Sequence, residues 1–135
     1  MKVKSLTTII LIVIVTMSVL LISCTNPTIE VITAQEAFDL IQENDGNPDF
    51  VIVDVRTPEE FFDGHLENAL NINYNSGTFN DDINKWDKNK KYIVYCRSGS
   101  RSAMAVSIMA DLGFREVYDM GGITAWIVKG FTIIK

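Results

Sequence analysis

The sequence predicts an α/β fold in which helices flank a central, mainly parallel sheet. Apolar runs of strand length alternate with helical patterns along the chain, the order typical of parallel sheets. Two of these runs, 50–55 and 92–96, are almost continuously apolar, as strands covered on both faces are. With 135 residues the chain has room for one domain.

The N-terminal segment has the pattern of a signal peptide. Lys2 and Lys4 precede an apolar stretch from Leu6 to Ile22 that carries no charge. The stretch ends in Leu-Ile-Ser-Cys, which resembles a lipobox, the processing site of lipoproteins. We expect residues 1–23 to be removed and Cys24 to be lipidated. An uncleaved anchor is the alternative, because the stretch is near the lower limit of about 17 residues for a spanning helix.

This processing defines the mature protein. Residues 24–29 are then a lipidated N-terminus with a short polar tether, and residues 30–135 form the domain. We expect a monomer that is extracytoplasmic and held by its lipid on the cell membrane or envelope. The whole chain has 12 basic and 17 acidic residues, and this acidic excess argues against a nucleic-acid partner. With Cys24 acylated, Cys96 has no cysteine left for an internal disulfide.

The first part of the domain is expected to be a short strand, a helix and a longer strand. Residues 30–32 form the short strand. Thr33 and Glu36 have the spacing of a capping box, which predicts a helix over 34–43 with one apolar face. A turn with glycine and proline follows, and the chain then enters the buried strand 50–55.

The middle of the domain is expected to contain shorter elements. Thr57 as cap and Pro58 in the first turn predict a short helix, which Gly64 ends. Residues 69–73 are expected to form a short strand, and a helical patch is expected around Ile83 and Trp86.

The last third places a cysteine between a strand and a helix. The run 92–96 predicts a buried strand, and the apolar pattern up to Leu112 predicts a helix. A strand over 116–120 and a helix opened by Gly121 and Gly122 complete the alternation. In such sheets ligands bind at the carboxyl ends of the strands. Cys96 lies at the carboxyl end of the predicted strand 92–96.

Cys96 is the candidate nucleophile. In the loop before a helix, backbone N–H groups and the positive end of the helix dipole favour a negative charge. A lone cysteine is more often inert packing, but Arg97 and Arg101 add positive charge here and should hold an anionic substrate. The thiol should therefore have a lowered pKa and react as a thiolate. The residues whose backbone groups are expected to cradle the substrate are Ser98, Gly99 and Ser100.

Three ordered motifs resemble the rhodanese-like (sulfurtransferase) domain family. They are the loop 96–102, the signature 54–72 and the closing signature 121–130, so the resemblance covers roughly residues 30–131. Two positions depart from the family pattern. Asn68 stands where the family usually has glycine, and Thr132 stands where a proline often follows the last glycine.

This resemblance implies a three-layer fold and a sulfurtransferase. In the implied mechanism the Cys96 thiolate takes a sulfur from a small anionic donor such as thiosulfate and carries it as a persulfide. The implied acceptor is a thiol, cyanide or a partner protein. Neither a metal nor an organic cofactor is required.

Four other polar residues are expected to support this site. Asp54, Arg56 and Glu60 could form a catalytic acid set, but we expect them to form a buried or half-buried network that ties a strand end to the next helix. His65 could act as a general base, but the resemblance implies a structural part for it.

Two other functions stay open. A cysteine-dependent phosphatase or arsenate reductase uses a similar loop, but with five residues between cysteine and arginine, whereas four separate Cys96 from Arg101. The histidine that often precedes the phosphatase cysteine is Tyr95 here. The second alternative is a non-catalytic rhodanese-like module that only binds a partner protein.

Overall fold

The computed structural model describes residues 26–135, which are built around a five-stranded parallel sheet. The strand order is β1-β5-β4-β2-β3, and every neighbouring pair is parallel. This arrangement confirms the predicted α/β fold with a central parallel sheet. The strands are β1 (Thr28–Val31), β2 (Phe50–Asp54), β3 (Leu70–Asn71), β4 (Lys91–Cys96) and β5 (Glu116–Gly122).

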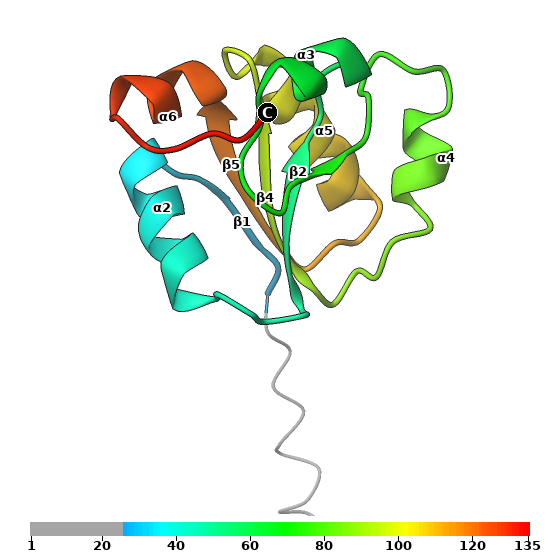
Figure 1. The fold of residues 1–135 in the computed structure, drawn as a ribbon. Coiled ribbons are helices and arrows are strands. Elements are labelled where there is room, and N and C mark those ends of the chain that lie inside the picture. The colour runs from blue at the N-terminus through cyan, green and yellow to red at the C-terminus, as the bar shows by residue number, and fades with distance from the viewer. Residues whose placement is uncertain (1–25) are drawn as a thin grey trace, which may run out of the picture.

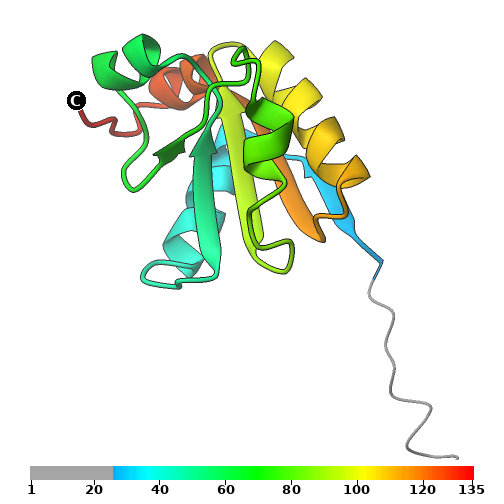
Figure 2. The ribbon, with the colours of Figure 1, turned by 90° about the vertical axis from the view of Figure 1, so that its right-hand side faces the viewer.

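Helices cover both faces of this sheet. Helices α2 and α6 pack on one face, whereas α4 and α5 pack on the other (Figures 1 and 2). Helix α3 lies near the end of the sheet where β2 and β4 finish (Figure 1). The helices are α2 (Ala34–Glu43), α3 (Pro58–Asp63), α4 (Phe79–Ile83), α5 (Ser100–Asp111) and α6 (Ile123–Val128).

Central strand β4 separates two hydrophobic clusters. Tyr92, Val94 and Cys96 face the cluster under α4 and α5, whereas Ile93 and Tyr95 face the cluster under α2 and α6. All five side chains are buried, because successive residues of a strand point to opposite faces and both faces are covered. Cys96 is the last residue of this strand, which is covered on both faces.

Capping boxes fix the starts of two helices. Thr33 and Glu36 form the predicted box at the start of α2. Thr57 and Glu60 form a second box at the start of α3, where Pro58 occupies the first turn as expected. These exchanges satisfy backbone N–H groups that have no partner inside the helix.

The structure differs from several predicted boundaries. Strand β1 covers Thr28–Val31, so it begins two residues before the predicted strand 30–32, within the segment predicted as a tether. The strand predicted over 69–73 is only two residues long, because β3 lies at the edge and pairs only with Val53 and Asp54 of β2. At the other end of the domain, β5 continues through Gly122, and α6 begins after it. A register shift between Val94 and Tyr95 of β4 accommodates this extension.

Asn68, one of the two departures from the family pattern, has a backbone φ of 61°. This is the left-handed region, which asparagine tolerates better than most residues other than glycine. The departure from glycine is therefore compatible with the backbone at this position.

The signal peptide predicted over 1–23 and the lipidation predicted at Cys24 lie outside the described residues. Within 26–135, none of the helices combines the length and the apolar character needed to span a bilayer.

Candidate active site

The loop between β4 and α5 forms a tight turn around the Cys96 sulfur. Gly99 is the N-cap of α5 and has φ 110° and ψ −16°. This backbone conformation is unfavourable for residues with a Cβ, which explains glycine at this position. The turn directs the Gly99 N–H inward, where it donates a hydrogen bond to Cys96 Sγ at 3.0 Å.

The Cys96 thiol is held in an environment that favours the thiolate. Cys96 is 1% exposed, and this burial raises the pKa of its thiol. The backbone N–H groups of Ser102, Gly99 and Ser98, together with the Ser102 hydroxyl, lower the pKa. The lowering outweighs burial, so the pKa of Cys96 lies below the ordinary thiol value. The expected reactive thiol therefore has a physical basis in the loop.

Ser102 is a site residue that the sequence reasoning did not single out. It is fully buried in the first turn of α5, and its hydroxyl donates to Gly99 O at 3.0 Å and lies 3.3 Å from Gly121 O. It thus joins the loop to the end of β5. Its signal in the sequence is a serine three residues after Gly99, on the face of the helix that turns toward the sheet.

The start of α6 closes the loop from the other side. A Cβ on Gly122 would lie 2.8 Å from Ser98 Cα and would also collide with Arg97 O. Thr124 Oγ1 donates a hydrogen bond to that same carbonyl at 3.0 Å. Position 122 requires glycine, because the backbone at Arg97 and Ser98 approaches it too closely for a Cβ.

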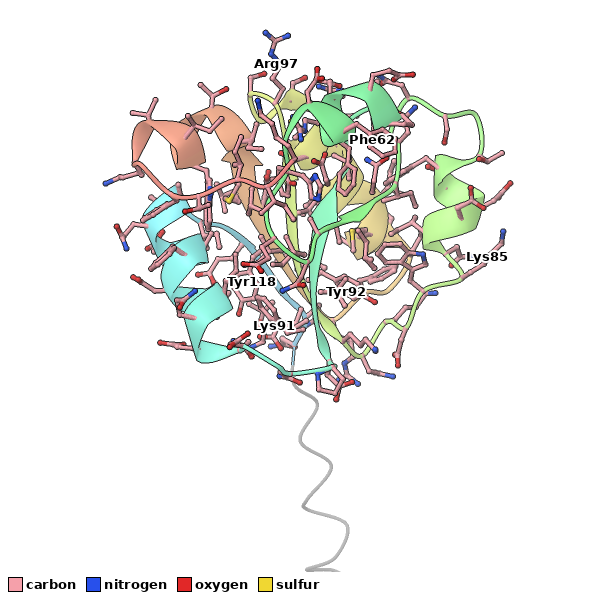
Figure 3. All side chains as sticks on the ribbon, in the orientation of Figure 1. Phe62, Lys85, Lys91, Tyr92, Arg97 and Tyr118 are labelled. Atoms are coloured by element: carbon pink, nitrogen blue, oxygen red, sulfur yellow. The ribbon has the colours of Figure 1, made fainter. Side chains whose placement is uncertain are left out.

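The two arginines of the loop have different positions. Arg101 Nη1 and Nη2 donate to the two carboxylate oxygens of Glu60 at 2.6 and 2.8 Å. Arg97 is exposed and its side chain points away from the domain (Figure 3). The sequence assigned both to substrate binding, but the guanidinium of Arg101 is already paired with a carboxylate.

The expected polar network divides into two separate pairs. Arg56 Nε donates to Asp54 at 3.0 Å, and Arg56 Nη2 donates to Asp54 Oδ2 at 2.7 Å and to Gly64 O at 2.6 Å. Both side chains are buried, so this pair ties the end of β2 to the end of α3. Glu60 was expected in the same network, but it pairs across the loop with Arg101.

His65 takes part in packing and backbone pairing. Its ring stacks on Phe61 with 3.7 Å between centroids, and its Nδ1 lies 2.9 Å from Phe61 O. Its backbone exchanges two hydrogen bonds with Ile134, both 2.9 Å long. These contacts of His65 are structural, because they join the turn after α3 to the C-terminal segment.

The site offers one sulfur nucleophile with N–H donors around it. Among residues 26–135, no three His, Cys, Asp or Glu side chains gather as a metal site would require. The chemistry that these groups can support is nucleophilic attack by sulfur, with the resulting negative charge held by the loop.

Comparison with known proteins identifies relatives of this chain. A family model described as a rhodanese-like domain matches residues 33–129. A thiosulfate sulfurtransferase of Coxiella burnetii is 33% identical over 92 residues, which cover 67% of this chain and 80% of that protein. A tRNA uridine(34) hydroxylase of Buchnera aphidicola is 37% identical over 84 residues, 57% of this chain. The match spans only 25% of the hydroxylase.

Solved structures show the same fold. A rhodanese-related protein from Thermoplasma volcanium superposes with a TM-score of 0.66 at 30% identity, covering 78% of this chain and 97% of that one. A rhodanese-like domain protein from Staphylococcus aureus has a TM-score of 0.61 at 36% identity, covering 72% of this chain and 90% of the other.

Proposed function

Because the chain belongs to the family of rhodanese-like domains, we propose that it is a sulfurtransferase that carries a sulfane sulfur on Cys96. The relatives named sulfurtransferase support this class of reaction. The donor is a small anion such as thiosulfate, and the acceptor is cyanide, a thiol or a protein.

The reaction consists of two displacements at sulfur. The Cys96 thiolate attacks the outer sulfur of thiosulfate, the sulfur–sulfur bond of thiosulfate breaks, and sulfite leaves with the bonding electrons. A persulfide with a negative terminal sulfur remains. An acceptor nucleophile then attacks that terminal sulfur, and the Cys96 thiolate leaves. A thiolate of lowered pKa suits both roles, as nucleophile and as leaving group.

The observation that carries this proposal is the Gly99 N–H, which donates to Cys96 Sγ at 3.0 Å inside a turn of backbone amides. Such donors can hold the negative charge of a thiolate or a persulfide without rearrangement. The pairing of Arg101 with Glu60 disfavours the phosphatase alternative. A phosphoryl group would need both Nη groups of the Arg101 guanidinium, and the Glu60 carboxylate already accepts hydrogen bonds from both.

The proposal is tested by comparing two reactions in the same protein. We expect the wild type to transfer sulfur from thiosulfate to cyanide and to leave an aryl phosphate unhydrolysed. Cys96→Ser should do neither, because a serine hydroxyl is barely ionised at neutral pH. Aryl phosphate turnover that exceeds sulfur transfer would favour the phosphatase, and no turnover of either substrate would favour the binding module.

We also propose that the domain is tethered outside the cytoplasm by a lipid on Cys24. The support is the sequence pattern of residues 1–24 alone. The proposal concerns location and leaves the chemistry at Cys96 unchanged.

A further inference from the structure

The ion pair between Glu60 and Arg101 joins two helices across the candidate active site. Arg101 is the second residue of α5, and Glu60 is the third residue of α3. Two parallel hydrogen bonds, 2.6 and 2.8 Å long, connect the guanidinium to both carboxylate oxygens. This bidentate geometry fixes the orientation of both groups.

Glu60 is itself held in place by the cap of α3. Its Oε2 accepts the Thr57 N–H at 3.0 Å, and its own N–H donates to Thr57 Oγ1 at 3.3 Å. The hydrogen bond from Arg101 is the largest influence on this carboxyl and lowers its pKa to about 2. The carboxylate therefore stays charged at neutral pH.

Arg101 lies in the first turn of α5, one residue before Ser102, whose backbone N–H interacts with the Cys96 sulfur. Glu60 raises the pKa of Arg101 most, and the charge of Cys96 raises it further. Of the other two cations near the loop, Arg56 pairs with Asp54, and Arg97 extends into solvent, where water and salt screen its charge (Figure 3).

We propose that Glu60 sets the donor charge that the Cys96 loop accepts. By neutralising Arg101, it shifts the preference of the site away from dianions such as thiosulfate and toward sulfane-sulfur donors with a single negative charge. The donor class in this inference rests on the proposed sulfur transfer. Its electrostatic part concerns the Cys96 thiolate and can be measured without any sulfur transfer.

Four variants separate the charge of Glu60 from its packing. Glu60→Gln keeps an oxygen that can accept the Thr57 N–H but removes the negative charge. Arg101→Gln removes the positive charge, and the double variant removes both. Glu59→Gln is the matched control, because Glu59 is an exposed neighbour in α3 and its loss changes the net charge equally.

The first readout is the rate of thiolate alkylation by anionic iodoacetate relative to neutral iodoacetamide. In Glu60→Gln the uncompensated Arg101 should raise this ratio, on the order of three- to tenfold at low salt. Arg101→Gln should lower the ratio, and the double variant should return close to the wild type. Glu59→Gln should leave the ratio close to that of the wild type.

The second readout is kcat/KM for thiosulfate, a dianion, relative to benzenethiosulfonate, a monoanion. Glu60→Gln should raise this ratio as well, mainly by lowering KM for thiosulfate. Because both donors deliver the same sulfur to the same thiolate, a packing defect would reduce both values together.

Two results would overturn the proposal. One is an equal shift in Glu59→Gln and Glu60→Gln, which would reflect net charge alone. The other is a Glu60→Gln variant with unchanged ratios, whether or not it reacts more slowly with all reagents. If alkylation shifts as expected but no variant transfers sulfur, the sulfurtransferase function fails while the electrostatic role of Glu60 stands. If sulfur transfer occurs and neither ratio moves, the function stands and the role of Glu60 is wrong.

Discussion

At the scale of single residues, burial and hydrogen bonding act on Cys96 in opposite directions. Burial alone would give an inert thiol with a raised pKa. The backbone N–H groups of Ser102, Gly99 and Ser98 reverse that effect. The reactivity proposed for Cys96 therefore depends on the backbone conformation of the loop more than on any one neighbouring side chain.

Gly122 provides a test of this dependence. In Gly122→Ala the new methyl group would meet Ser98 Cα at 2.8 Å, so the loop must move away from β5. We expect sulfur transfer to fall at least tenfold, because a shift of about 1 Å in a catalytic group can cost up to a hundredfold. The rate with thiosulfate and cyanide measures this effect.

The matched control for this variant is Gly77→Ala, since a Cβ at Gly77 meets nothing within 4 Å. This substitution should leave the rate unchanged. A Gly122→Ala protein with the wild-type rate would show that the loop tolerates displacement.

At the scale of elements, the Asp54–Arg56 pair connects β2 with the end of α3. Both side chains are buried, and Arg56 also donates to Gly64 O at 2.6 Å. Removing one partner of a buried pair leaves an uncompensated charge in the interior. Gly64 caps the C-terminal end of α3, so the bond from Arg56 holds the end of the helix that carries Glu60.

Arg56→Met should therefore destabilise the domain strongly. We expect the free energy of unfolding to fall by about 3–5 kcal/mol, because Asp54 would stay buried without its cation. Urea denaturation at neutral pH measures this change. Lys85→Met is the control, because Lys85 and its partner Asp82 form an exposed pair and its loss should be barely measurable. Similar losses in both variants would contradict the account.

Local patterns predicted most elements well, and contacts between distant residues explain the rest. The capping spacing of Thr33 and Glu36 predicted the observed start of α2. The partner of Glu60 could not be predicted, because Arg101 lies 41 residues further along the chain and only the tertiary fold brings the two side chains together. The extension of β5 likewise depends on its register with β4, which no local pattern encodes.

At the scale of the whole molecule, the parallel sheet separates the start of the domain from the candidate site. Thr28 begins β1 and Cys96 ends β4, so the two residues lie at opposite ends of the sheet (Figure 1). With a lipid on Cys24, only a few residues before Thr28, the Cys96 loop would face away from the bilayer. Donors and acceptors would then reach it from the aqueous side.

The Cys24→Ala variant tests this arrangement. It should no longer incorporate labelled fatty acid and should not be cut after residue 23, because the thiol that accepts the lipid is missing. Sulfur transfer by the purified variant should equal that of the wild type. Fatty-acid labelling that persists in Cys24→Ala would contradict the lipoprotein assignment.

The most direct test of the central claim is the intact mass of the purified domain, residues 24–135, after exposure to thiosulfate. We expect one added sulfur atom, located on Cys96 by peptide mapping and removed by a reducing thiol. Cys96→Ser should gain no mass under the same conditions. A wild-type domain that gains no sulfur, or gains it at a residue other than Cys96, would contradict the account.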